Sequence, residues 1–390
     1  MNAAPTSRST DVAGSAAERG IDVAVNLLWC VPGQVGGSEQ YLVRQLEGLA
    51  AETEGLVPTL YCLSSFAAAH PGLVDRFDAV SPSIAGTNRP RRVVAEHTWL
   101  AHRTKTADLV HHGGGTVPAL GGGPVVLTIH DLQYETFPHY ISPVKLRYLR
   151  MVMPRSVARA ALITVPTEYV RSTVVERFGL EADRVMVVPH GVEPDLGAGA
   201  RSEHELRRSF GLGDGRVLVL PAVTHPHKGH RFLLRVMAAH WGDPELRLVL
   251  LGGRGAADDE IRQEVVRLGL ERRVVFAGRV TDADRDGLIA LADALVFPSE
   301  YEGFGAPVVE AMALGTPVVC SDRPALAEVV GDAGLVLPFD PEAWSDVLDR
   351  VERDGASMRR AGDRRARDFT AAASGAALAS AYRYARATAA

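Results

Sequence analysis

Two carboxylates, Glu302 and Glu310, bracket a glycine-rich turn in the stretch FPSEYEGFGAPVVE, with seven residues between them. The residue types predict a strand at 294–298, a turn at 303–307 and a helix at 308–314. In a parallel sheet, such a turn lies at the carboxyl end of its strand, where ligands bind. Bare glycine N–H groups and a helix N-terminus favour anions, and ionised carboxylates accept hydrogen bonds from hydroxyls. The turn is therefore suited to bind phosphates and hydroxyls together.

A lysine, Lys228, follows a predicted strand at 217–221 and precedes a helix. A lysine in this place can neutralise a phosphate, with help from the helix N-terminus. The alternative is a solvated surface lysine. The nearby His225, His227 and His230 do not have a familiar zinc spacing, so we interpret them as loop and helix-start residues.

The segment Asp284-Arg285-Asp286 has the Asp-x-Asp form of a metal-binding motif. It falls in the first turn of a predicted helix that Thr281 caps, where carboxylates complement the helix dipole. We therefore expect no metal site there.

Other residues near the predicted strand ends could bind polar ligands. His130 ends an apolar strand and could hydrogen-bond a sugar hydroxyl or a developing charge; a structural histidine is the alternative. Gly36 and Gly37 open a helix after the first strand, but the full dinucleotide fingerprint is missing. Glu39 is interpreted as a first-turn helix carboxylate.

The segment 144–159 is basic and amphipathic, and no acidic residue occurs between Glu135 and Glu168. Its cations are interleaved with apolar residues. Such a segment could contact an anionic lipid surface or a phosphorylated acceptor, and a solvated basic helix face is the alternative.

Composition describes an ordinary globular chain: 390 residues, 46% hydrophobic and 23% charged, with a net charge of −5. This charge does not favour general nucleic-acid binding. Cys30, Cys62 and Cys320 are far apart in apolar segments and fit a reducing, cytoplasmic setting. Residues 1–20 are small and polar with no signal-peptide core, so we expect a disordered tail. No apolar run approaches the length of a membrane span.

Short apolar strands alternate with helical stretches, which predicts two doubly wound parallel α/β domains. We expect an N-terminal domain at 21–195, a linker within 191–202, a C-terminal domain at 203–370, and a last helix at 371–390 that could cross back to the first domain. The predicted strands are 23–29, 57–63, 109–111, 125–129, 162–165, 185–188, 217–221, 247–251, 274–277, 294–297, 318–321 and 334–337.

Several segments together resemble retaining glycosyltransferase family 4 (glycosyl transferases group 1), whose GT-B fold has two Rossmann-like domains facing a cleft. The specific segments are FAGRV, ADALVFPSEYEGFGAPVVEAMALGTPVV and PALAEVVGDAG. Weaker likenesses follow in the order typical of the family: VGGSEQYL, TIHD, VPTEYVRS, VPHGV and PHKGH.

The resemblance implies roles for these residues. Glu310 would hold the ribose of a nucleotide-sugar donor, and Glu302 would hold the sugar with the backbone at Gly303, Phe304 and Gly305. Lys228 would stabilise the diphosphate. The family usually carries an arginine just before this lysine, but residues 222–225 contain none.

Thr224, His227 or an arginine from elsewhere, such as Arg254, would have to replace the missing cation. The resemblance further assigns Gly37 and Val280 to the donor-binding surface and His130 to the catalytic group. His190 stands where the family often has asparagine and is interpreted as structural.

The implied activity is transfer of a hexose, with mannose favoured, from GDP-mannose or a UDP-hexose to a glycan, lipid-linked or small-molecule acceptor, with the anomeric configuration retained. No metal or other cofactor is expected. The implied setting is the cytoplasm, with peripheral membrane contact through 144–159. Two alternatives remain: a nucleotide-sugar epimerase of the same fold, and a sugar-nucleotide-binding protein without catalysis.

Overall fold

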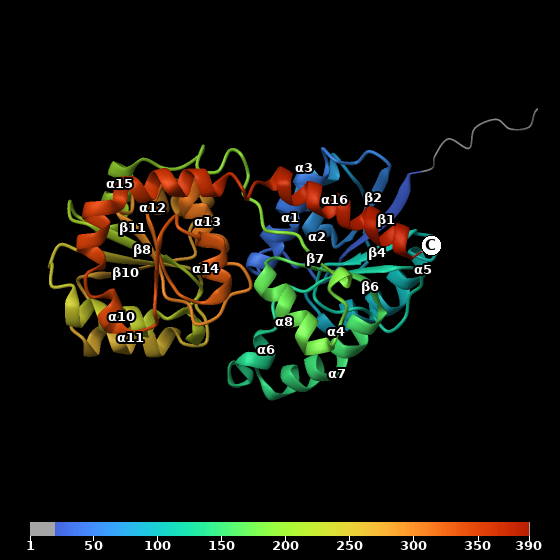
Figure 1. The fold of residues 1–390 in the computed structure, drawn as a ribbon, viewed down its shortest axis with the longest axis horizontal. Helices are drawn as coiled ribbons and strands as arrows, with labels where there is room; N and C mark the ends of the chain where they lie inside the picture. The colour runs from blue at the N-terminus through green and yellow to red at the C-terminus, as the bar shows by residue number, and fades with distance from the viewer. Residues whose placement is uncertain (1–19, 390) are drawn as a thin grey trace, which may run out of the picture.

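Two parallel sheets organise the chain, one in each half (Figure 1). The computed structural model describes residues 20–389. The tail expected at 1–20 lies outside the described residues except for Gly20. We refer to the halves that carry the two sheets as the first and second domains.

The sheet of the first domain has the order β3-β2-β1-β4-β5-β6-β7, with every pair parallel. Its strands are β1 (Ile21–Leu27), β2 (Leu56–Cys62), β3 (Asp78–Val80), β4 (Leu109–His112), β5 (Val125–Thr128), β6 (Ala160–Val165) and β7 (Val185–Val187). Its helical segments are α1 (Gly37–Leu49), α2 (Ser64–Ala69), α3 (Pro71–Val74), α4 (Arg89–Ala95), η1 (Glu96–Leu100), α5 (Ala101–Arg103), α6 (Gln133–Thr136), η2 (Pro138–Tyr140), α7 (Pro143–Arg159), α8 (Glu168–Phe178) and η3 (Ala182–Arg184).

The sheet of the second domain has the order β10-β9-β8-β11-β12-β13, again parallel. Its strands are β8 (Val217–Pro221), β9 (Arg247–Leu251), β10 (Val274–Gly278), β11 (Ala294–Phe297), β12 (Val318–Ser321) and β13 (Leu335–Leu337). Its helical segments are α9 (Glu203–Phe210), η4 (Pro226–Lys228), α10 (His230–His240), α11 (Asp258–Arg267), α12 (Asp282–Leu291), α13 (Ala306–Ala313), α14 (Pro324–Val330), η5 (Pro341–Trp344) and α15 (Val347–Ala366). The chain ends its described elements with α16 (Ala371–Thr388).

The strand order reverses between β1 and β4 and again between β8 and β11, which is the doubly wound arrangement. The predicted fold class is thereby confirmed. Strands β8, β9, β11 and β12 have the predicted bounds, and the other predicted strands differ by one or two residues at an end. Sequence reasoning missed β3, because it is only three residues long and mostly exposed.

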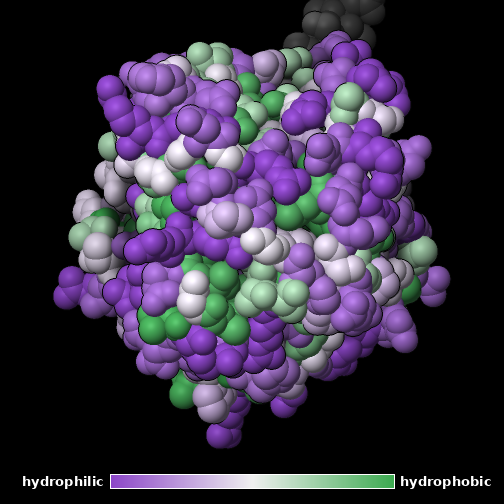
Figure 2. Space-filling model, turned by 90° about the vertical axis from the view of Figure 1, so that its left-hand side faces the viewer, coloured by the Kyte–Doolittle hydropathy of each residue, from purple (hydrophilic) through white to green (hydrophobic). Residues whose placement is uncertain are grey.

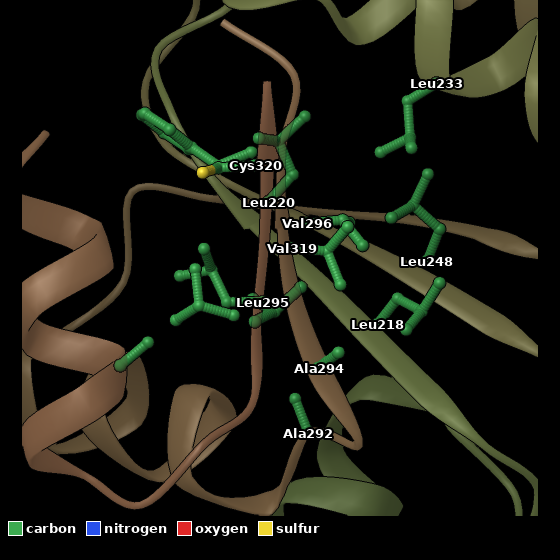
Figure 3. Packing of buried hydrophobic residues seen from close by; sticks show 14 of the residues in the cluster. Leu218, Leu220, Leu233, Leu248, Ala292, Ala294, Leu295, Val296, Val319 and Cys320 are labelled. Carbon is green, nitrogen blue, oxygen red and sulfur yellow. The ribbon is translucent and has the colours of Figure 1, made fainter. Parts of the chain in front are cut away.

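The second domain is held together by strands that are buried on both faces. In Figure 3, Leu218 of β8 lies on the same side of the sheet as Val296 of β11 and Val319 of β12, where Leu233 approaches from α10. Leu295 and Cys320 lie on the opposite side. Continuous apolar runs of this kind are typical of a parallel sheet covered by helices on both sides. The core thus fixes the carboxyl ends of these strands, which carry the candidate site.

The last helix, α16, packs on the first domain although it follows the second in sequence (Figure 1). Leu378 and Tyr382 are fully buried in the core that β1 and α1 form. The helices cross closely at two glycines, since a Cβ on Gly375 would lie 2.1 Å from the carbonyl carbon of Gly48. The first domain therefore shares its core with the end of the chain.

Two segments of the chain, one at Val192 and one at 369–371, connect the domains and run side by side. The N–H of Val192 donates to the carbonyl of Phe369 at 2.8 Å, and the N–H of Ala371 donates back to Val192 at 2.9 Å. The hinge is thus a paired crossing rather than a single flexible linker.

The end of the molecule that the second domain forms is mostly hydrophilic, with small, separated hydrophobic patches (Figure 2). Across residues 20–389, no helix combines the length and the apolar character that a bilayer span requires.

Candidate active site

The glycine-rich turn after β11 lies directly against the first domain. A Cβ on Gly303 would lie 2.1 Å from the carbonyl oxygen of His130, so only glycine fits this approach. Thr167, the N-cap of α8, donates its hydroxyl to the carbonyl of Gly303 at 2.9 Å. The N–H of Leu132 donates to the hydroxyl of Tyr301 at 3.0 Å. These contacts bring the turn and the segment after β5 together.

Gly305 caps the helix that carries the second carboxylate. It has φ +98, and α13 begins at the next residue. A Cβ there would also lie 2.5 Å from the side chain of Leu326. The turn therefore needs glycine at both 303 and 305, and no side chain caps the first N–H groups of α13.

Lys228 and Glu302 form an ion pair, with Nζ 2.6 Å from Oε1. Both side chains are largely buried, at 20% and 12% exposure. The adjacent Gly229 has φ +72 and packs so tightly that a Cβ would lie 1.9 Å from the carbonyl oxygen of Pro298. The structure thus brings together two predicted site residues that are 74 positions apart.

The second carboxylate, Glu310, is bound by an arginine of the first domain. Nη1 of Arg44 in α1 lies 2.8 Å from Oε1 of Glu310. The same guanidinium forms an ion pair with Glu193, which precedes α9 in the linker, at 2.5 Å. Arg44 gave no signal in the sequence, because it is one of several polar residues in the middle of an amphipathic helix.

Histidine and aromatic rings form the first-domain side of the interface. The His190 ring is stacked between Tyr41 and Phe304, at centroid distances of 4.0 and 4.5 Å. His190 therefore occupies a packed position, as a structural residue would. Burial holds its pKa well below the ordinary value.

His130 lies next to this stack, with its ring 5.2 Å from that of Tyr41. Nε2 donates to the carbonyl of Gly113 at 2.9 Å, which leaves Nδ1 as the acceptor of the neutral ring. Burial lowers the pKa of His130, although the hydrogen bond to Gly113 acts in the opposite direction. The ring can therefore accept a hydrogen bond from a hydroxyl.

Arg254, the candidate for the missing cation, is bound by carboxylates. It pairs with Asp258 at 2.9 Å and with Asp259 at 2.6 Å, and its side chain is 68% exposed. A different arginine, Arg279, lies between two glycine loops. Its Nη1 donates to the carbonyl of Gly33 at 2.8 Å, and a Cβ on Gly253 would lie 3.8 Å from its Nη2.

Arg279 makes no ion pair to a carboxylate in the described part of the chain. It lies in the FAGRV segment, so the motif was visible in the sequence although this residue was not singled out. Its charge is therefore available to a ligand in a way that the charge of Arg254 is not.

The remaining predicted donor-binding residues have mainly local contacts. Gly37 is the first residue of α1. Glu39, two residues later, accepts a hydrogen bond from the N–H of Gly33 at 2.8 Å and pairs with His70 at 2.9 Å, so it shapes the loop before α1. Val280 follows β10 and packs against the core of the second domain.

The Asp-x-Asp segment forms an ion pair and a hydrogen bond with residues of the linker. The Asp284 carboxylate pairs with Arg201 at 2.8 Å. The backbone N–H of Asp284 donates a hydrogen bond to the hydroxyl of Thr281, which caps the helix. Asp286 pairs with Arg285 and accepts a hydrogen bond from the N–H of Gly197 at 3.2 Å. The segment thus joins α12 to the interdomain connection.

Burial keeps the histidines around Lys228 neutral. It lowers the pKa of His227 to about 3 and that of His230 to about 4, and the Lys228 ammonium adds to both shifts. Within residues 20–389, no group of three or more histidine, cysteine or acidic side chains is arranged to hold a metal ion.

Two family models match the chain. The model described as "Glycosyltransferase Family 4" matches residues 35–196, and "Glycosyl transferases group 1" matches residues 202–369. The chain belongs to this glycosyltransferase family. The resemblance inferred from the motifs is thereby confirmed.

Curated relatives of this glycosyltransferase include mannosyltransferases. O-antigen chain mannosyltransferase B of Escherichia coli is 34% identical over 252 residues, which cover 63% of this chain and 66% of the relative. The MMP alpha-(1->4)-mannosyltransferase of Mycolicibacterium hassiacum is 30% identical and is covered to the same extent, with 68% of this chain aligned. The alignments thus span about two thirds of these relatives.

Solved structures share the fold of this glycosyltransferase over nearly their whole length. Anabaena HepE in complex with UDP and glucose has a TM-score of 0.71 at 20% identity, covering 92% of this chain and 98% of that one. Sucrose-phosphate synthase from Thermosynechococcus elongatus has the same TM-score and identity, with 93% and 98% covered. These likenesses establish the GT-B architecture.

Proposed function

We propose that this chain is a retaining hexosyltransferase that uses a nucleotide-diphosphate sugar, with mannose favoured as the sugar. The observation that carries the proposal is the arrangement at one sheet edge. Lys228 is paired with Glu302, and the double-glycine turn and Glu310 that follow contact the first domain. The names of the mannosyltransferase relatives support mannose and, with it, GDP-mannose as donor.

In the proposed reaction, the C1–O bond to the diphosphate breaks and its electron pair leaves with the phosphate oxygen. The Lys228 ammonium stabilises that charge, and Glu302 orients the lysine through the 2.6 Å contact. The acceptor hydroxyl enters on the same face and gives its proton to the departing phosphate. Because Glu302 is tied to the leaving-group cation, it is better suited to orientation than to nucleophilic attack.

His130 and the glycine turn complete the sugar site in this proposal. Nδ1 of His130 accepts a hydrogen bond from a sugar hydroxyl, and the backbone N–H groups at Phe304 and Gly305 donate to others. Gly37 and Val280 line the donor surface. Glu310 accepts hydrogen bonds from the ribose hydroxyls.

We propose Arg279, rather than Arg254, as the second cation near the diphosphate. Arg254 is already neutralised by two carboxylates, whereas the only polar contact of Arg279 within the described residues is a backbone carbonyl. With a lysine, an arginine and backbone donors at the phosphates, the reaction needs no metal. Transfer that persists in EDTA supports this, and loss of transfer that Mg²⁺ or Mn²⁺ restores would overturn it.

We further propose that the chain acts in the cytoplasm and that α7 contacts anionic lipid at the inner face of the membrane. Val144 is 82% exposed and Met151 is 52% exposed on this basic helix. Arg159 is instead used internally, since it donates to the carbonyl of Gly121. The variant Arg147→Glu/Arg150→Glu should lose co-flotation with phosphatidylglycerol vesicles. Equal binding to phosphatidylcholine vesicles would contradict the proposal.

The main test is a panel of GDP, UDP, ADP and their hexose conjugates, first by thermal shift and then by product analysis. A ligand that binds the native state raises its melting temperature. Glycosylated acceptor or slow donor hydrolysis, with the anomeric configuration retained, supports the proposal. Epimerised donor without transfer would identify the epimerase alternative, and binding without turnover would identify a non-catalytic protein.

A further inference from the structure

Arg44 belongs to the first domain by sequence and by position in α1, yet its guanidinium contacts both the linker and the second domain. Nη1 donates to Oε1 of Glu310 at 2.8 Å, and Nη2 donates to Oε1 of Glu193 at 3.1 Å. Nε also forms the ion pair of 2.5 Å with Oε2 of Glu193. The side chain of Arg44 is only 5% exposed. One buried side chain thus joins three separate parts of the molecule.

The charges explain why an arginine suits this position. Burial alone lowers the pKa of Arg44, but the two carboxylates offset this and the pKa is raised overall. A planar guanidinium can contact two carboxylates at once with a fixed angle between them, and a lysine ammonium has no such fork. A buried charge without its partners would be costly, so the three side chains are fixed as a unit.

In this unit, one carboxylate oxygen of Glu310 keeps its capacity to accept a hydrogen bond. Its contacts with Arg44 use Oε1, and Oε2 makes no hydrogen bond to the residues that the structure describes. The rotamer of a free glutamate would otherwise have to be ordered when a ligand binds, which lowers affinity. The guanidinium has ordered it in advance.

We propose that Arg44 is a positioning residue that holds the Glu310 carboxylate so that its second oxygen accepts a hydrogen bond from the donor ribose. The inference rests on the ribose role proposed for Glu310. Through Glu193 the same guanidinium ties this carboxylate to the hinge. Ribose recognition therefore depends on a residue of the opposite domain.

The test compares GDP with 2′,3′-dideoxy-GDP by calorimetry on the full chain, with UDP and its dideoxy form in parallel. Arg44→Gln should weaken GDP binding by about tenfold, the scale of one hydrogen bond to a charged group, and should change dideoxy-GDP binding by less than about twofold. Arg44→Lys keeps the charge but loses the fork, so we expect an intermediate loss for GDP alone. Equal weakening of both nucleotides in the two variants would reduce Arg44 to a structural role and overturn the inference.

Two further variants separate this inference from the proposed function. Glu310→Ala should by itself remove the preference for ribose, and adding Arg44→Gln to it should weaken GDP no further. If Glu310→Ala keeps the ribose preference, the proposed role of Glu310 fails. If Glu310→Ala removes it but Arg44→Gln leaves GDP binding unchanged, only the role of Arg44 fails. Glu193→Gln, which leaves the contact between Arg44 and Glu310 in place, is the matched control and should change GDP binding less than Arg44→Gln does.

Discussion

The two domains present different chemistry at their common interface. The second domain contributes charged side chains held by glycine turns, such as Lys228 paired with Glu302 beside Gly303. The first domain contributes rings, with His190 stacked on Tyr41 and His130 close by. GDP-, UDP- and ADP-sugars share a diphosphate and a ribose, so charges and glycine turns suit the donor-binding role proposed for this side. The packed rings of the first domain are held in place by the fold around them, and they shape the surface that faces the second domain.

Removal of the Lys228 charge should have the largest effect of the changes considered. It tests whether the charged residues of the second domain stabilise the transition state. Lys228→Ala should lower turnover at saturating donor and acceptor by roughly 10²-fold, the scale of one preorganised stabilising group. Nucleotide affinity should fall less, because the charge develops as the bond breaks. Lys105→Ala, at an exposed position after α5, is the control. A fall of less than a few-fold would move the role to another cation.

Arg254 and Arg279 of the second domain sharpen the comparison, because Arg254 pairs with two carboxylates and Arg279 pairs with none among the described residues. Arg279→Met should weaken binding of a nucleoside diphosphate by about tenfold and leave binding of the nucleoside unchanged, the result of losing one charged hydrogen bond. Arg254→Met, the matched variant, should leave both affinities within about twofold. Calorimetry with GDP and guanosine measures this difference. The reverse result would restore Arg254 as the phosphate ligand.

A substitution among the packed rings of the first domain should affect the free energy of unfolding more than it affects donor binding. His190→Asn removes the ring between Tyr41 and Phe304 and should lower the free energy of unfolding by about 1 kcal/mol, the scale of an aromatic pair. Urea denaturation gives this value, and calorimetry should show nucleotide affinity within about twofold of the original. A large loss of nucleotide affinity would mean that the two sides act as one unit.

The pH dependence of stability is the last test, and it needs no substitution. Burial lowers the pKa of His111 and of His112 to about 3, and that of His230 to about 4, from 6.5. Below pH 6.5 the unfolded chain takes up protons that the folded chain excludes, so stability falls as pH falls. Each such histidine contributes up to ~1.4 kcal/mol per pH unit. Urea denaturation from pH 7.5 to about 5 should show a flat region and then a decline. A flat profile throughout would contradict buried neutral histidines.

Much of the fold was predictable from the sequence because its signals are local. The run from strand β11 through the glycine turn to α13 is contiguous, so Glu302 and Glu310 were recognised with their secondary structure. Strand β3 was missed because three mostly exposed residues carry no periodicity. Predicted strand ends were otherwise correct within two residues.

Contacts between distant segments could not be predicted in the same way. The contact between Arg44 and Glu310 joins residues 266 positions apart, and no pattern around Arg44 distinguishes it from its neighbours in α1. The pairing of Arg254 with Asp258 and Asp259 is local and could have been recognised, since carboxylates in the first turn of a helix attract a preceding arginine. The sequence thus predicted elements and motifs better than the partners of individual charges.

The position of α16 has a consequence for how the protein is made. Leu378 and Tyr382 belong to the core around β1 and α1, and they follow the whole second-domain sheet in sequence, so the ribosome adds them after it. Domains generally fold as units during synthesis, with the N-terminal domain first. Here the N-terminal domain emerges with part of its core still missing. This domain can complete its core only after the second domain has been synthesised. A chaperone that covers the surface on which α16 later packs should therefore raise the yield of native protein.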